Sequence, residues 1–166
     1  MSSNQKIMMY VGIGLLVTLA AIGLWMLLKC SGIKHGGKCY NVIAQDDPTS
    51  TLANVAKIKD GKMDTSADKS STTAATVTLK VNGATDAAKK KVKGARVTAK
   101  ADLVANSTTK SKVKLANGLT TKEFEFAQDG KSSSVVVLFD ADQEIGAGGL
   151  TLTIDPNVTV YEVELI

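Results

Sequence analysis

The chain has 166 residues and a formal net charge of +4. This length leaves room for one folded domain and an anchor segment. Only two prolines occur in the whole chain, and this disfavours a proline-rich linker or an intrinsically disordered chain.

An uncharged apolar run at residues 7–28 follows a short N-terminal tail, residues 1–6. As a helix rising about 1.5 Å per residue, the run spans about 33 Å, which matches the hydrocarbon core of a bilayer. Lys6 and Lys29 bracket it, and Tyr10 and Trp25 lie about one turn inside its ends, where amphipathic rings meet lipid headgroups. The sequence therefore predicts a single-pass membrane protein, with these four residues at the membrane interface and the bilayer as a partner.

A cleaved secretory signal peptide is the alternative for this run. Its apolar stretch is longer than that of a signal peptide, and no small-x-small cleavage site follows it. We therefore expect the helix to be retained in the mature protein.

The cues for membrane orientation conflict. Lys29, Lys34 and Lys38 follow the run and outnumber the lysine before it, which favours a C-terminal domain on the cytoplasmic side. Two other features favour the outside: Cys30 and Cys39 could form a disulfide, and Asn106 and Asn157 match the N-glycosylation pattern. We expect the cytoplasmic side, with a virion membrane as one setting.

A juxtamembrane loop at residues 29–39 contains Cys30, Cys39 and the single histidine, His35. The two cysteines could close a disulfide, or Cys30 could be lipidated beside the bilayer. A zinc site is disfavoured, because a fourth ligand is missing and the spacing fits no CxxC pair. We expect a flexible cationic hinge against lipid headgroups.

Residues 40–166 change to a period of two, with Asn-Gly and Asp-Gly pairs between segments, which is the pattern of half-buried strands joined by tight turns. The predicted strands are residues 77–81, 96–104, 112–116, 121–127, 133–140, 150–155 and 158–165. The predicted fold is therefore mainly β, an antiparallel β-sandwich. An immunoglobulin-like topology is one option, although the Cys-Trp-Cys core is absent.

Three finer expectations accompany this fold. The uninterrupted apolar run 135–139 predicts a central strand that is buried on both faces. Residues 52–59 could form a short helix or a further strand, and residues 60–73 read as a polar loop.

The sequence contains none of the usual catalytic motifs: no GxSxG, no Walker loop and no HExxH. We therefore expect neither enzyme activity nor a cofactor. The best metal candidate is the alternating trio Asp140, Asp142 and Glu144, which is placed in a turn and could offer oxygen ligands to calcium. An acidic, solvated connection between strands is the favoured interpretation of this trio.

A basic run consists of Lys89, Lys90, Lys91, Lys93 and Arg96. It could bind phosphates of nucleic acid or of anionic lipid, but it lacks the interleaved aromatic residues of nucleic-acid sites. A solvated loop is favoured, and nucleic acid is disfavoured as a partner.

Charge is distributed unevenly along the domain. Residues 76–114 contain ten basic and two acidic residues, whereas residues 123–166 contain nine acidic residues and one lysine. The two segments could cancel each other within one sandwich, or they could give the molecule a positive and a negative side that attracts copies or partners.

The predicted function is a structural or interaction protein that tethers a β-sandwich to a membrane-bounded assembly. A minor capsid protein that links a virion membrane to its shell is an example, with other structural proteins or further copies as partners. One alternative is a cell-surface adhesion or carbohydrate-binding module. Another is a membrane-tethered binder of nucleic acid or anionic lipid through residues 89–96.

Overall fold

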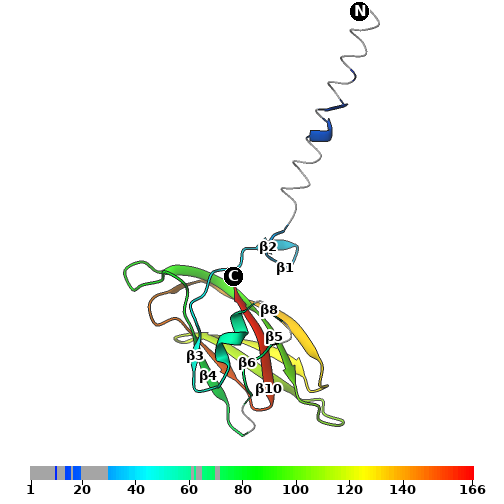
Figure 1. The fold of residues 1–166 in the computed structure, drawn as a ribbon, viewed down its shortest axis with the longest axis vertical. Helices are drawn as coiled ribbons and strands as arrows, with labels where there is room; N and C mark the ends of the chain where they lie inside the picture. Colours follow the sequence, from blue (N-terminus) through cyan, green and yellow to red (C-terminus); the bar gives the residue numbers. More distant parts are fainter. Residues whose placement is uncertain are drawn as a thin grey trace, which may run out of the picture. The chain divides into compact units, whose positions relative to one another are not determined.

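The computed structural model describes residues 10, 14–15, 17–19, 30–60, 62, 65–69 and 72–166. It divides the chain into two compact units, Met1–Tyr40 and Asn41–Ile166. Figure 1 shows the ribbon of both units, which are described one at a time below.

The described part of the predicted transmembrane segment is helical. It comprises Tyr10, Gly14, Leu15 and residues 17–19, and the Thr18 hydroxyl donates a 2.8 Å hydrogen bond to the Gly14 carbonyl one turn earlier. The rest of the predicted span, with the interface residues Lys6, Trp25 and Lys29, lies outside the described residues. Within the described part of the chain, no helix has the length and apolar character needed to cross a membrane.

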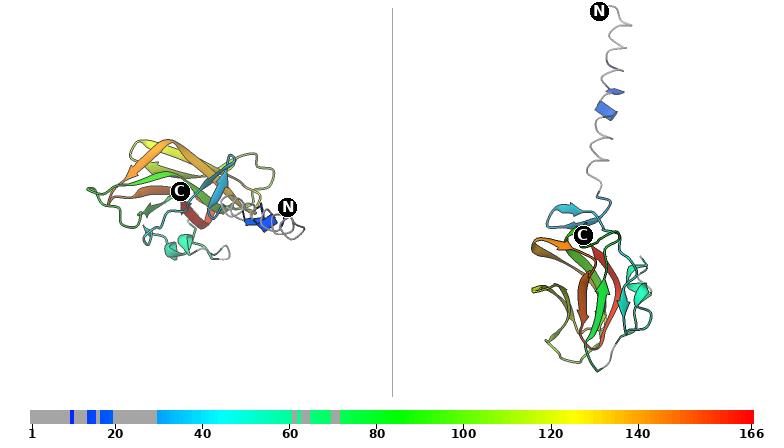
Figure 2. Two further views of the ribbon diagram at one scale, coloured as in Figure 1. Left: turned by 90° about the horizontal axis from the view of Figure 1, so that it is seen from above. Right: turned by 90° about the vertical axis from the view of Figure 1, so that its left-hand side faces the viewer.

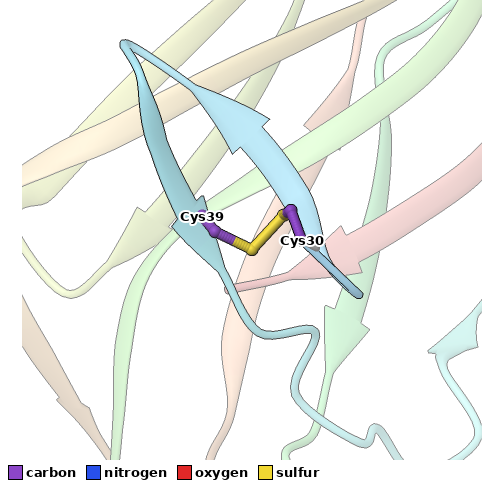
Figure 3. Close-up of a disulfide and its surroundings, with 2 residues drawn as sticks. All are labelled: Cys30 and Cys39. Carbon is purple, nitrogen blue, oxygen red and sulfur yellow. A yellow bond between two sulfur atoms is a disulfide. The ribbon is translucent and has the colours of Figure 1, made fainter. Parts of the chain in front are cut away.

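The first unit also contains a β-hairpin, β1 (Ile33–His35) and β2 (Lys38–Tyr40). Gly36 and Gly37 form its turn with φ angles of 54° and 75°, a conformation that L side chains rarely adopt. A disulfide joins Cys30 to Cys39 beside the hairpin (Figure 3). The expectation of a flexible hinge here was wrong, because paired strands and a covalent link close the segment.

The second unit is mainly β and forms an antiparallel β-sandwich (Figures 1 and 2). The strands of its five-stranded sheet, in spatial order, are β3 (Thr49–Ser50), β4 (Ala75–Leu79), β9 (Leu150–Ile154), β6 (Lys110–Asn117) and β7 (Thr120–Ala127). Those of its three-stranded sheet are β10 (Val158–Leu165), β5 (Lys90–Ala101) and β8 (Ser132–Ile145). A short 3-10 helix, η1 (Val55–Lys59), realises the helical option for residues 52–59.

The core lies between the two sheets and follows from the alternation in the sequence. Val77 and Leu152 from the five-stranded sheet, and Val97 and Val160 from the three-stranded sheet, belong to one buried apolar cluster. Phe124 and Phe126 on β7 are the largest fully buried side chains among the described residues. Burying these side chains is the main favourable term for the sandwich.

Asn-Gly pairs mark turns as the sequence predicts. Gly118 and Leu119 join β6 to β7 directly after Asn117, and Gly118 has a φ of 57°. In this antiparallel pair Asn117 lies opposite Thr120, so the connection has the shortest usual length for a hairpin.

Two details of the predicted strands were wrong. β8, which contains the apolar run 135–139, is an edge strand, and β5 is the centre of its sheet. Within this run Val135 and Val137 pack against the core, and all but Phe139 are only half-buried. Leu103, which belongs to the predicted strand 96–104, is 70% exposed in the loop after β5.

Candidate functional site

The basic run lies on a strand, and the expectation of a loop was wrong for most of it. Lys90, Lys91 and Lys93 belong to the first part of β5, and Lys89 immediately precedes the strand. All four side chains are exposed, whereas Val92 between them is fully buried. Among the described residues, none of the four lysines takes part in an ion pair. We call these four residues the β5 lysines.

Arg96 differs from the β5 lysines. Its guanidinium contacts the carboxylate of Glu164 on β10, and both side chains are partly buried. The structure therefore separates the predicted basic patch into four exposed lysines and one ion-paired arginine.

The acidic trio lies on β8 beside the β5 lysines, not in a turn. In the antiparallel register Glu144 faces Lys91, without an ion pair between them within the described part of the chain. Between the register pairs Val92–Gln143 and Gly94–Leu138, β8 has four residues where β5 has only Lys93, so Asp140 and Asp142 lie in a bulge.

This bulge spreads the carboxylates instead of gathering them. Asp140 accepts a 2.7 Å bond from Lys122 of β7, in the other sheet. This ion pair already occupies one carboxylate of the trio. The described residues contain no group of three His, Cys, Asp or Glu side chains that could hold a metal.

The lysines of β6 contrast with the β5 lysines, because each of them is paired. Lys110 bonds Glu125 at 2.9 Å, while Lys112 and Lys114 approach Glu123 at 2.6 and 3.2 Å. The hydrogen bond from Lys112 lowers the pKa of Glu123, with a second contribution from Lys114, and the same bond to Glu123 raises the pKa of Lys112. This cross-strand ladder occupies the solvent-facing side of β6 and β7.

Ion pairs thus join the positive and negative segments of the sequence within one molecule. Arg96 and the three β6 lysines all pair with carboxylates from residues 123–166. The β5 lysines are the largest cluster of basic side chains that these pairs leave uncompensated in the described part of the chain. Of the exposed carboxylates on the neighbouring segment of β8, Asp140 pairs with Lys122, which leaves Asp142 and Glu144 beside the β5 lysines.

A pocket of about 360 Å³ lies along β10, lined by residues 42–45, Lys59 and residues 162–164. Its polar groups are already engaged: Lys59 contacts Asp47 at 2.9 Å and the Gln45 carbonyl at 3.1 Å, and the Gln45 amide donates to the Val163 carbonyl at 2.9 Å. Sequence reasoning missed this pocket because its walls come from segments more than 100 residues apart, and no local pattern marks them.

In the first unit, the structure exposes the three basic side chains of the hairpin, Lys34, His35 and Lys38. Both cysteines are in the disulfide, so neither thiol is free for lipidation or metal binding. Of the predicted membrane-interface residues, the structure describes only Tyr10, which is 68% exposed.

Comparisons with known proteins add little to this geometry. No protein-family model matches the chain, and no curated protein matches it. Among solved structures it is similar to CpGH89CBM32-5 from Clostridium perfringens, solved in complex with GalNAc-β-1,3-galactose. The TM-score is 0.42 at 12% identity, and the match covers 72% of this chain and 95% of that chain. A likeness of this size carries no argument about function.

Proposed function

We propose that the chain is a membrane-anchored interaction protein without catalytic activity, whose β-sandwich binds an acidic surface of another structural component through the β5 lysines. The observation that carries this proposal is the contrast between two sets of lysines on neighbouring parts of one domain. Each β6 lysine has a carboxylate partner within 3.2 Å, whereas the β5 lysines have none among the described residues.

A free cluster of this kind suits a contact with another molecule. Exposed ion pairs within a domain contribute little to stability, so the β6 ladder mainly neutralises its own surface. Uncompensated charges instead guide encounter with an oppositely charged partner and fix its orientation. Lys90 and Lys91 pair with β8 and Val92 is fully buried, so this part of β5 is held in place by the sheet and the core.

Anchoring in the membrane rests on the uncharged run 7–28. Such an anchor holds the sandwich near a membrane-bounded assembly and raises its local concentration there. A modest affinity for a neighbouring protein is then sufficient for stable attachment.

The test uses poly-L-glutamate as the acidic probe and two matched variants of the full chain in detergent. The first variant changes Lys89, Lys91 and Lys93 to Gln. The second changes Lys110, Lys112 and Lys114 to Gln, which removes the same net charge. We expect the first variant to lose most of the binding measured by surface plasmon resonance and the second to retain it. Equal losses in both variants would show that only net charge matters and would refute the proposed surface.

A second candidate function, an outward-facing adhesion or carbohydrate-binding module, is favoured by one observation, the Cys30–Cys39 disulfide. Disulfides persist mainly in oxidising compartments. Asn106 and Asn157, the two predicted glycan acceptors, are exposed turn residues and could carry glycans in such a compartment. A glycan array on which the full chain binds one sugar class, with the first lysine variant binding equally well, would support this candidate over the first.

A further inference from the structure

The disulfide-closed hairpin of the first unit concentrates positive charge at one turn. Lys34, His35 and Lys38 lie within five residues, and the sequence contains no acidic residue before Asp46. All three side chains are exposed, and within the described residues Lys34 and Lys38 form no ion pair. Nothing nearby in the sequence can neutralise this turn.

The hairpin also fixes the backbone positions of its basic residues. His35 and Lys38 are register partners across the turn, and Lys34 lies opposite Cys39 in the next pair. The Cys30–Cys39 disulfide and the Gly36-Gly37 turn hold the arrangement together. A turn that is already fixed loses little conformational freedom when its lysines bind an anion.

The position of the hairpin in the chain indicates which anion it meets. Cys30 comes two residues after the predicted span 7–28, and each strand of the hairpin has three residues, which reach only about 10 Å. The basic side chains therefore stay close to the headgroup layer, at distances comparable to the Debye length of about 8 Å at physiological salt.

We propose that the hairpin Cys30–Cys39 is a binding site for the phosphate headgroups of anionic phospholipids. This inference rests on the membrane anchoring in the proposed function. Each lysine near an anionic surface is worth about 1 kcal/mol, which corresponds to about fivefold in binding. Two lysines in a closed hairpin thus provide a measurable preference for anionic over zwitterionic lipid.

The test places the full chain in lipid nanodiscs and measures the association of spin-labelled phosphatidylglycerol relative to spin-labelled phosphatidylcholine by electron paramagnetic resonance. Three variants are compared with the natural sequence. They are Lys34→Gln with Lys38→Gln, Lys110→Gln with Lys112→Gln as the charge-matched control, and Cys30→Ser with Cys39→Ser.

We expect a phosphatidylglycerol preference in the natural sequence, a fall by up to about fivefold per lysine in the hairpin double variant, and no change in the control. The serine variant should lose part of the preference, because the open chain no longer holds the basic side chains together. A ratio near one in the natural sequence, or an equal preference in the hairpin variant and the control, would overturn the inference. Failure of the chain to enter nanodiscs would instead refute the anchor itself, so the two failures are distinguishable.

Discussion

Lys91 on β5 and Glu144 on β8 lie opposite each other in the three-stranded sheet, so the most basic and one of the most acidic stretches of the sequence are neighbours. A molecule with a positive and a negative pole is therefore disfavoured. On the other side of β5, Arg96 likewise pairs with Glu164 of the acidic segment. The sequence left two arrangements of the charged segments open. The observed ion pairs favour the one in which the two segments neutralise each other within one molecule, and the β5 lysines carry most of the positive charge that remains.

The anchor can be tested with one substitution in the predicted span. Leu16→Arg should cost about 2.5 to 3.5 kcal/mol of insertion free energy, because a charge is placed near the centre of the apolar run. The natural sequence should stay in the membrane pellet after carbonate extraction, and the variant should be partly released. Release of the natural sequence without detergent would show that the run is no anchor.

The sandwich core predicts that truncating two apolar side chains, one on β7 and one in the turn before it, has very different effects on the free energy of unfolding. Phe124 is fully buried, whereas Leu119 is fully exposed at the tip of the β6–β7 hairpin. Phe124→Ala should lower the free energy of unfolding by about 3–5 kcal/mol, and Leu119→Ala should change it by about 0.5 kcal/mol or less. Urea unfolding of residues 40–166, followed by circular dichroism, measures both. Similar effects for the two variants would contradict the described core.

Gly94 lies where the backbones of β5 and β8 leave no room for a side chain on β5. A Cβ atom at this position would be 2.2 Å from the Val137 carbonyl oxygen and 2.8 Å from the Leu138 Cα, and both are backbone atoms that cannot rotate away. Gly94→Ala should therefore destabilise the sandwich by about 3 kcal/mol or more. Gly148→Ala is the matched control, because no atom lies within 4 Å of its added Cβ. Equal midpoints of thermal unfolding for the two variants would argue against this strand contact.

Acid should weaken the β6 ladder. The hydrogen bond from Lys112 lowers the pKa of Glu123, so the carboxylate contributes stability above the pKa of an unfolded glutamate, about 4.3, and loses that contribution as the pH falls through its folded value. The pKa of Lys112 is raised, so its contribution is lost only as the pH rises past the lysine range. We expect Glu123→Gln to reduce the loss of stability between pH 5 and pH 3. An identical pH profile in the variant would contradict the ladder.

The disulfide leads to a prediction about the cellular compartment in which the hairpin lies. In its native membrane the chain should react with a thiol-specific maleimide reagent only after reduction, because Cys30 and Cys39 are joined. Two reactive thiols before reduction, with alkylating agent present throughout lysis, would place the hairpin in a reducing compartment and support the cytoplasmic orientation that Lys29, Lys34 and Lys38 predict.

Local patterns predicted much of the second unit. Val77 and Leu79 alternate with polar residues and are buried on β4, and Gly118 and Gly130 mark turns that the structure contains. These features depend on the pleat of one strand or on the conformation of one residue, which neighbouring residues decide.

Strand order and the site could not be predicted in this way. Whether Val135–Phe139 lies at the centre or the edge of a sheet depends on pairing with residues about 40 positions away, and the apolar run alone does not encode it. The same holds for the lysines: Lys91 and Lys112 look alike in the sequence, and only the pairing of β6 with β7 gives Lys112 its partner Glu123.

A zero-length carbodiimide crosslinker, applied to the full chain in its native membrane, tests whether the β5 lysines contact an acidic surface of another protein. This reagent joins a lysine to a carboxylate only where the two are in direct contact. We predict crosslinks from Lys89, Lys90, Lys91 or Lys93 to carboxylates of a second polypeptide, identified by mass spectrometry of the linked peptides. Links from these lysines only to Glu144 or Asp142 of the same chain, with intermolecular links confined to other parts of the sandwich, would contradict the account.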